Sequence, residues 1–251
     1  MRITVASTLS LAAALISCGL VVSAAGGALP KTIELTADDG LLVTGNVYEA
    51  AQPKAVILLF HQAGSSKDEY ASIAPKLTEA GFSALAIDQR SGGNLFGKNE
   101  TAARVKGKAG YRDALHDLEA ALAWGLMSKK PVIVWGSSYS SSLVFELAAK
   151  HPAGVAALLS FSPGEYLGPG TPVRDAAGNV KVPVFVTAAK DPAELSAAKA
   201  IFDAVVGTSK VFSTPQTAGV HGSSTLIDAR NPAGAKENWQ PVLAFLKSAI
   251  P

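Results

Sequence analysis

The sequence has a single cysteine, Cys18, so no disulfide can form within one chain. It also lacks any block of like charge: 22 basic and 20 acidic residues are scattered along 251 positions, with a formal net charge of +2. A protein that follows a phosphate backbone or an anionic membrane surface concentrates its cations, so we expect no nucleic-acid partner. No group of His, Cys, Asp and Glu has metal-ligand spacing, and we expect neither a metal nor another cofactor.

Charged residues are few overall, at 17% against 48% hydrophobic residues, and this composition excludes disorder as the main state. Internal repeats and a dividing linker are also missing. We therefore predict one domain over residues 30–251 that encloses a sizeable core.

The first residues have the layout of a secretory signal, with one cation at Arg2, an apolar stretch to about Val22 and then small residues. Cleavage after Ala24 would make residues 1–24 the signal. The tetrapeptide "LISC" also resembles a bacterial lipobox, in which case residues 1–17 are removed and Cys18 carries lipid. Both versions predict export to the bacterial periplasm or cell envelope, and the second adds membrane association through a lipidated N-terminus. A buried N-terminal helix or a retained membrane anchor is the alternative.

The rest of the chain alternates short apolar runs with helical patterns. Residues 31–50 alternate on either side of Asp39-Gly40, as a two-stranded hairpin would, and "KAVILLF" and "FSALAID" are typical of strands buried on both faces. Helical patterns follow these runs, including one over residues 67–80, and further strands are predicted at "PVIVW", "GVAALLSF", "VPVFVTA" and "KVFST". This order predicts an α/β fold, a mostly parallel sheet with helices on both faces and the hairpin at one edge.

Five serines interrupt this pattern in "PVIVWGSSYSSSLVFELAAK", between a predicted strand and a predicted helix. The register Gly136-Ser137-Ser138-Tyr139-Ser140 puts Ser138 at the centre of a G-x-S-x-G pattern whose last glycine is serine. Small residues are needed there because the turn brings strand and helix close together. The alternative is a polar helix cap without chemistry.

A serine hydroxyl becomes a nucleophile only when a base takes its proton and an acid orients that base. Asp191 follows the strand "VPVFVTA", and His221 lies in the glycine-bounded loop "AGVHGSS" before the last helix. We predict that Ser138, His221 and Asp191 form a catalytic triad. Glu194, three residues after Asp191, is the alternative acid.

With this order of serine, acid and histidine, the chain resembles the α/β-hydrolase family. The resemblance implies an oxyanion hole made by the backbone N–H groups of Tyr139 and of Ala63 in "HQAG", where Gln62 replaces the glycine of most members. It also implies that His61 orients its loop, and that Asp88 and Arg90 of "DQRSGG" are structural.

The short loops leave no room for a large cap domain, and the chain is similar to the dienelactone-hydrolase-like group and carboxylesterases, here with serine as nucleophile. The resemblance implies a serine hydrolase acting on small-molecule carboxylic esters, because an open site suits small or medium esters. Peptidase or thioesterase action on the same triad, and a non-catalytic binding protein with this fold, are the alternatives.

Overall fold

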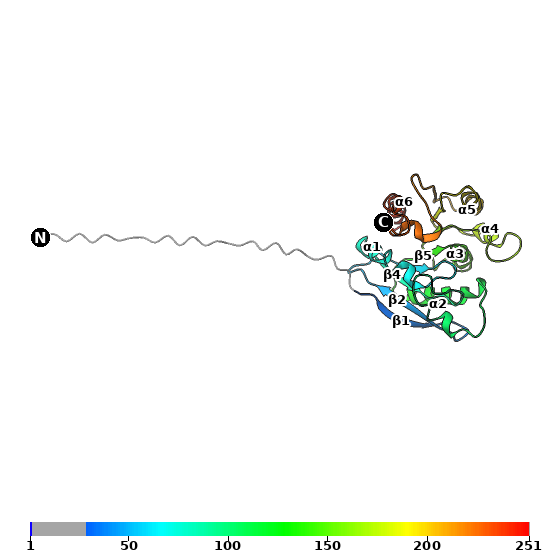
Figure 1. Ribbon diagram of the computed structural model, residues 1–251, viewed down its shortest axis with the longest axis horizontal. Helices are drawn as coiled ribbons and strands as arrows, with labels where there is room; N and C mark the ends of the chain where they lie inside the picture. The colour runs from blue at the N-terminus through cyan, green and yellow to red at the C-terminus, as the bar shows by residue number, and fades with distance from the viewer. Residues whose placement is uncertain (2–28, 251) are drawn as a thin grey trace.

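The computed structural model describes residue 1 and residues 29–250, so the predicted leader with Cys18 and Ala24 lies outside the described residues, apart from Met1. Within residues 29–250 the chain forms an eight-stranded sheet in the order β1-β2-β4-β3-β5-β6-β7-β8 (Figure 1). The strands are β1 (Lys31–Thr36), β2 (Leu42–Tyr48), β3 (Ala55–Phe60), β4 (Phe82–Ile87), β5 (Val132–Ser137), β6 (Ala157–Phe161), β7 (Val184–Thr187) and β8 (Lys210–Ser213).

The sheet is mostly parallel, as predicted. β1 pairs antiparallel with β2, and β2 antiparallel with β4, whereas every pair from β4 through β3 to β8 is parallel. The β1–β2 hairpin turns at Ala37–Leu41 and forms one edge of the sheet. Because the parallel strands share one direction, the loops that follow β3, β5, β7 and β8 all emerge at the same end of the sheet.

Helices cover both faces of the sheet. The α-helices are α1 (Ala74–Glu79), α2 (Leu115–Met127), α3 (Tyr139–Lys150), α4 (Pro172–Ala177), α5 (Pro192–Ala204) and α6 (Ala235–Ala249). Short 3₁₀ helices are η1 (Lys67–Tyr70), η2 (Ala102–Arg104), η3 (Arg112–Ala114) and η4 (Gly222–Leu226). None of the helices within residues 29–250 is both long and apolar enough to span a membrane, and no large cap domain is inserted among these residues.

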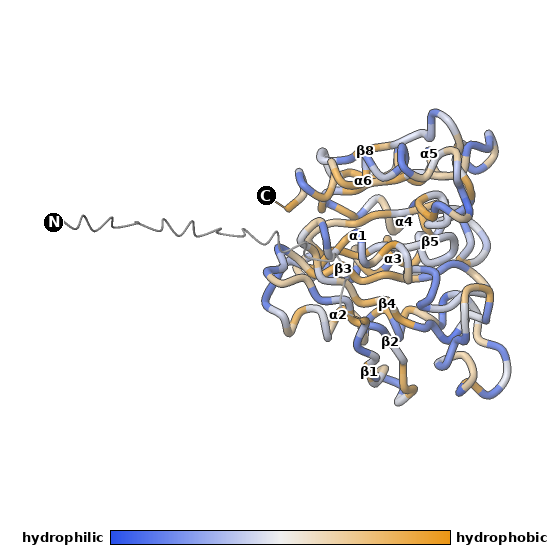
Figure 2. The backbone as a smooth tube through the Cα atoms, turned by 60° about the vertical axis from the view of Figure 1, so that its left-hand side comes forward, coloured by the Kyte–Doolittle hydropathy of each residue, from blue (hydrophilic) through white to orange (hydrophobic). Residues whose placement is uncertain are grey.

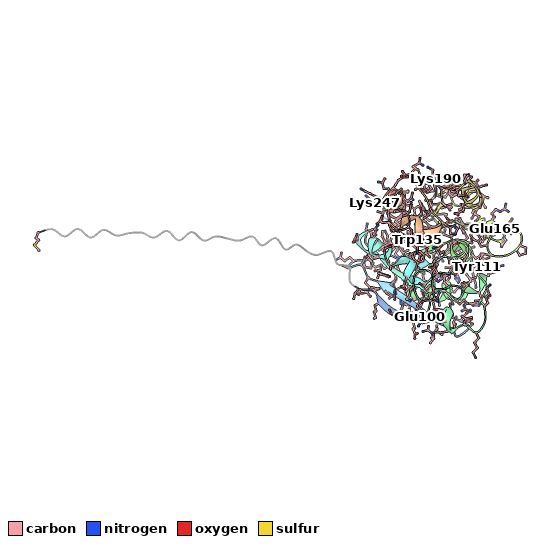
Figure 3. All side chains as sticks on the ribbon, in the orientation of Figure 1. Glu100, Tyr111, Trp135, Glu165, Lys190 and Lys247 are labelled. Carbon is pink, nitrogen blue, oxygen red and sulfur yellow. The ribbon has the colours of Figure 1, made fainter. Side chains whose placement is uncertain are left out.

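Two apolar clusters hold the layers together. One face of the sheet packs on α2, α3, α4 and α5, and the opposite face packs on α1 and α6. All six residues of β3 are buried and alternate between the clusters: Leu58 belongs to the first, and Ile57 and Leu59 to the second. The apolar segments therefore run through the middle of the domain (Figure 2), and Trp135 of β5 is fully buried at its centre (Figure 3).

The predicted elements differ from the structure in two places. The helix expected over residues 67–80 is interrupted: η1 begins after the cap Ser66, and α1 starts anew just before Pro75. Proline is tolerated in the first turn of a helix but not in its interior, which accounts for the break. The second is α4 between β6 and β7, a short helix that the strand and helix patterns do not predict and that also starts with a proline, Pro172.

Candidate active site

Ser138 occupies the sharp turn between β5 and α3. Its backbone has φ +58° and ψ −124°, a left-handed conformation that is strained for any residue with a side chain. The Ser138 side chain makes no capping hydrogen bond to α3, which argues against the simple helix-cap alternative. The strained turn instead leaves its hydroxyl at the carboxyl end of the sheet, with the residue 8% exposed.

Two residues that flank the turn show why small side chains are needed there. A Cβ atom on Gly136 would lie 2.2 Å from the backbone oxygen of Ser140, so only glycine fits there. Ser140, which stands where the motif usually has glycine, is fully buried, and its hydroxyl donates to the backbone oxygen of His61 at 2.6 Å. Its side chain therefore ties the turn to the loop after β3.

His221 lies between Ser138 and a carboxylate. Its Nε2 is 2.8 Å from the Ser138 Oγ, and its Nδ1 is 2.9 Å from Oε1 of Glu194. Both side chains are partly exposed, 38% for His221 and 29% for Glu194. With Nδ1–H donated to the carboxylate, Nε2 is left as the acceptor that a serine proton needs.

The structure does not place Asp191 against His221, contrary to the prediction. Asp191 is the N-cap of α5, and its Oδ1 accepts from the N–H groups of Ala193 and Glu194, both at 3.0 Å. Those bonds satisfy two free donors at the start of the helix and hold the Asp191 carboxylate there. Glu194, the alternative acid, is the residue that reaches the histidine.

A signal for this assignment is present in the sequence "DPAE". An N-cap aspartate, a proline at the first helical position and a glutamate three residues after the cap together mark a helix start. In the structure Glu194 Oε2 lies 3.4 Å from the backbone N–H of Ala189, just before the cap, while Oε1 remains available to His221.

The loop that carries His221 is fixed by two serines, Ser162 and Ser137, that are not among the predicted catalytic residues. The N–H of Gly222 donates to Ser162 Oγ at 2.9 Å, and the N–H of Ser223 donates to Ser137 Oγ at 2.8 Å. Gly222 has φ +65°, and a Cβ atom there would lie 2.4 Å from Ser137 Oγ. A polar residue directly after the buried strand β6 was the available signal for Ser162.

The predicted oxyanion donors are backbone N–H groups in the loop after β3 and at the start of α3. Tyr139 is the first residue of α3, and among the described residues neither its backbone N–H nor that of Ala63 donates to another protein group. The preceding N–H, that of Gln62, points inward and donates to Oε2 of the buried Glu69 at 2.8 Å. Two free N–H groups therefore remain for an oxyanion.

His61 orients its loop, as expected. Its Nε2 accepts from the N–H of Gln89 at 2.9 Å, and its Nδ1 lies 2.8 Å from the backbone oxygen of Gln62. Burial lowers the pKa of His61 to about 4, so the ring is neutral at physiological pH and donates only through Nδ1. Asp88 and Arg90 are structural: Asp88 pairs with Lys67 at 3.0 Å, and Arg90 pairs with Asp117 at 2.9 Å.

Shallow hollows border the loop after β3 on two sides. One, of about 240 Å³, is lined by Gln62, Leu95, Phe96, Val220, His221, Ser224 and Arg230. The other, of about 310 Å³, includes Gly64, Ser91 and Tyr111, and the Tyr111 ring stacks on that of Tyr139 at 4.4 Å. The first hollow includes His221 and can therefore receive part of a substrate whose reacting carbon lies at Ser138. The second is linked to the site only through the stacking of Tyr111 on Tyr139.

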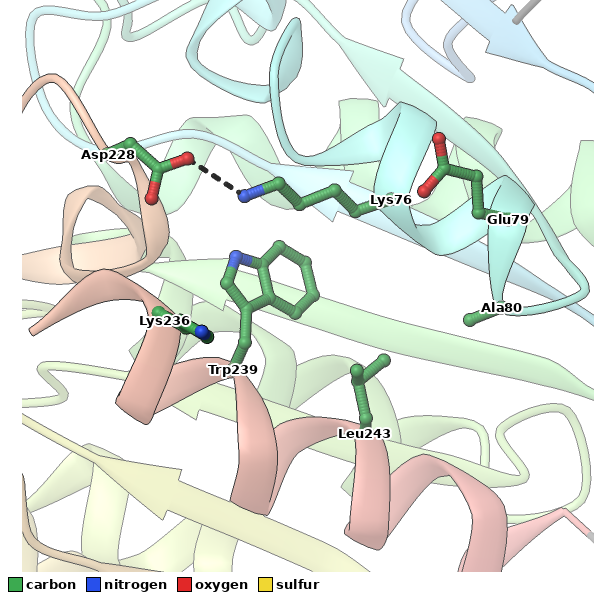
Figure 4. Close-up of a pocket in the computed structure, with 7 residues that line it drawn as sticks. All are labelled: Lys76, Glu79, Ala80, Asp228, Lys236, Trp239 and Leu243. Atoms are coloured by element: carbon green, nitrogen blue, oxygen red, sulfur yellow. Dashed lines mark hydrogen bonds and ion pairs between the residues drawn. The ribbon is translucent and has the colours of Figure 1, made fainter. Parts of the chain in front are cut away.

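A larger hollow, of about 590 Å³, lies between α1 and α6 (Figure 4). Lys76 bridges it, pairing with Asp228 at 3.1 Å and lying 5.5 Å from the centre of the Trp239 ring. None of the residues that line it belongs to the Ser138 site, so the hollow that includes His221 marks the candidate active site instead. Among the described residues no three His, Cys, Asp or Glu side chains converge to hold a metal ion.

A strained serine at the strand–helix turn, a histidine on the last loop and a mostly parallel sheet define the class of α/β-hydrolases. Residues 51–209 match the family described as "Serine aminopeptidase, S33", and the chain belongs to this family of serine hydrolases. The match includes Ser138 and Glu194 and ends before His221. A search of curated protein sequences finds no match.

Solved structures share the fold at low sequence identity. An esterase from Pyrococcus furiosus is 17% identical, with a TM-score of 0.68 over 90% of this chain and 93% of its own. A carboxyl esterase from Bacillus coagulans is 13% identical, with a TM-score of 0.66 over 89% and 100%. A dienelactone hydrolase from Anabaena variabilis is 16% identical, with a TM-score of 0.68 over 89% and 100%.

Proposed function

We propose that the protein hydrolyses carboxylic esters through an acyl-enzyme on Ser138, with His221 as general base and Glu194 as the acid that orients it. The observation that carries the proposal is the continuous hydrogen-bonded chain from Ser138 Oγ through both ring nitrogens of His221 to the Glu194 carboxylate, at 2.8 and 2.9 Å. Each group in this chain has the partner that its role requires.

The reaction proceeds in two steps. His221 Nε2 takes the Ser138 proton as Oγ attacks the ester carbon, and the N–H groups of Ala63 and Tyr139 stabilise the oxyanion that forms. Collapse of this intermediate breaks the ester bond, and the imidazolium gives its proton to the departing alcohol. Water then attacks the acyl-enzyme by the same route, releasing the acid and restoring the serine. Glu194 holds the Nδ1–H and stabilises the imidazolium in both steps.

The hollow beside His221 favours small or medium esters. It has a volume of about 240 Å³ and opens directly onto the surface without a tunnel for a long chain. The solved structures with the same fold include an esterase, a carboxyl esterase and a dienelactone hydrolase, which supports an ester substrate for this chain by analogy of fold.

The test has two measurements on the same preparation. A fluorophosphonate probe should label Ser138, identified by peptide mass, and Ser138→Ala should abolish both labelling and hydrolysis while the circular dichroism spectrum stays unchanged. A panel of p-nitrophenyl esters of graded chain length should be hydrolysed faster than aminoacyl anilides. Faster cleavage of the anilides would identify a peptidase, and activity that survives in Ser138→Ala would exclude this serine as the nucleophile.

We further propose that the protein is exported and that residues 1–24, or residues 1–17 with lipid on Cys18, act as the signal. The support is the sequence pattern of Arg2, the apolar stretch and "LISC". Intact-mass measurement of protein from the native envelope distinguishes the two, because a lipidated form keeps residues 18–24 and gains its acyl chains. A mature chain that still begins at Met1 would contradict both.

A further inference from the structure

The 3₁₀ helix η1 brings a carboxyl group into the core next to the active site. Glu69 of η1 is only 1% exposed, although a buried carboxyl group is costly unless it is well paired. Its segment is anchored on either side, by the Ser66 cap before it and by Tyr70, whose hydroxyl donates to the backbone oxygen of Phe60 at 2.6 Å. None of the catalytic steps above uses Glu69.

The Glu69 carboxylate contacts two of the loops that build the site. Oε2 accepts from the Gln62 N–H at 2.8 Å, directly before the proposed donor Ala63, and Oε1 accepts from the Ser137 hydroxyl at 2.7 Å, directly before the nucleophile. Ser137 in turn accepts from the Ser223 N–H at 2.8 Å, two residues after His221. Because the Ser137 proton goes to Glu69, its oxygen is free to accept from Ser223.

We propose that Glu69 is a positioning residue: its ionised carboxylate fixes the oxyanion loop to the nucleophile turn and, through Ser137, to the loop that carries His221. This role rests on the proposed ester hydrolysis at Ser138. We call Glu69 with its two partners, the Gln62 N–H and the Ser137 hydroxyl, the Glu69 clamp. A proton on either Glu69 oxygen would place a donor opposite one of these two donors, so the clamp requires the charged carboxylate.

The surroundings of Glu69 make its ionisation sensitive to pH near neutrality. Burial raises the pKa of Glu69 to about 7, and hydrogen bonds from Gln62, Ser137 and Ser65 oppose the shift. The groups that face it, from the loop after β3 and from β5, are uncharged. Its own element also carries Asp68 and Lys67, which pairs with Asp88 at 3.0 Å. Tyr70, the next residue, has a pKa well above the usual value because of burial and the Glu69 charge.

The experiment compares the full chain with Glu69→Gln and Ser137→Ala, measuring p-nitrophenyl acetate hydrolysis and fluorophosphonate labelling from pH 5 to 9. In the unchanged protein both rates should fall below about pH 7 as Glu69 takes up a proton. Glu69→Gln should remove this ionisation from both pH profiles and lower kcat about tenfold at pH 8, with KM changed less than about twofold.

Ser137→Ala gives an independent arm should Glu69→Gln fail to fold. Loss of the hydroxyl removes a hydrogen bond to the carboxylate, so the Glu69 ionisation should move to higher pH. Glu79→Gln, the same substitution at an exposed position of α1, is the matched control and should leave both rates unchanged.

Identical pH profiles in the unchanged protein and Glu69→Gln, or an acidic limb that does not move in Ser137→Ala, would overturn the role of Glu69 while leaving ester hydrolysis standing. Absence of both labelling and hydrolysis in the unchanged protein would overturn the proposed function, and the role of Glu69 with it. The two failures are therefore distinguishable.

Discussion

Asp191 and Glu194 are three residues apart, yet only Glu194 reaches His221. Asp191 sits outside the first turn of α5 with its side chain turned back to the free N–H groups, whereas Glu194 lies inside that turn with a longer side chain. A helix cap therefore decides which carboxylate is free to orient the histidine. The two residues also give a matched pair of isosteric substitutions.

Glu194→Gln should lower kcat by about 10²-fold or more, because a neutral amide cannot stabilise the imidazolium and can turn its NH₂ group, a donor, toward Nδ1–H. Asp191→Asn should keep kcat within about threefold, since asparagine is also a good N-cap. Steady-state kinetics with p-nitrophenyl acetate measures both. A large loss in Asp191→Asn with full activity in Glu194→Gln would restore Asp191 as the acid.

At the scale of elements, the loop after β3 divides its successive N–H groups between two tasks. The Gln62 N–H faces inward to Glu69, and the Ala63 N–H is left for the substrate. The neutral His61 ring fixes the same loop, because one of its nitrogens contacts the Gln62 backbone oxygen and the other accepts from the Gln89 N–H. Gln62 in place of glycine does not disturb this arrangement, because its side chain donates to Ser224 Oγ at 3.2 Å beside His221.

Ala63→Pro tests this division. The substitution deletes the N–H and should lower kcat on the order of 10²-fold, whereas Ala63→Gly keeps the donor and should retain most of the activity. Thermal unfolding of both variants controls for damage to the loop. Full activity in a folded Ala63→Pro variant would remove Ala63 from the oxyanion hole.

The sequence alone predicts the elements that depend on local patterns. Strand periodicity and small flanking residues identify the Ser138 turn, and a glycine-bounded loop before the last helix identifies His221. It does not identify Glu69, because the partner that holds its carboxylate in the core, Ser137 of β5, is distant in the sequence. The prediction of Asp191 over Glu194 fails for a different reason: side-chain direction at a helix start depends on the cap, and in "DPAE" the cap holds Asp191 at the helix end.

At the scale of the whole molecule, the clamp around Glu69 joins β3, β5 and the loop before α6, so its ionisation affects the stability of the domain as well as its activity. The folded protein holds the Glu69 proton up to about pH 7, whereas the unfolded chain releases it near the usual value of 4.5. Between these values the folded state binds more protons, so stability falls as pH rises through this window. The folded protein is thus less stable when Glu69 carries the charge that the site needs.

Glu69→Gln removes this titration. The free energy of unfolding of the variant, minus that of the unchanged protein, should therefore increase from pH 4.5 to pH 8, by up to about 3 kcal/mol. Urea unfolding at a series of pH values measures the difference, with Glu79→Gln as the control that should show no trend. A difference that is constant with pH would show that Glu69 ionises alike in the folded and unfolded chain. Activity and stability should consequently change in opposite directions with pH in the unchanged protein, and that opposition should disappear in Glu69→Gln.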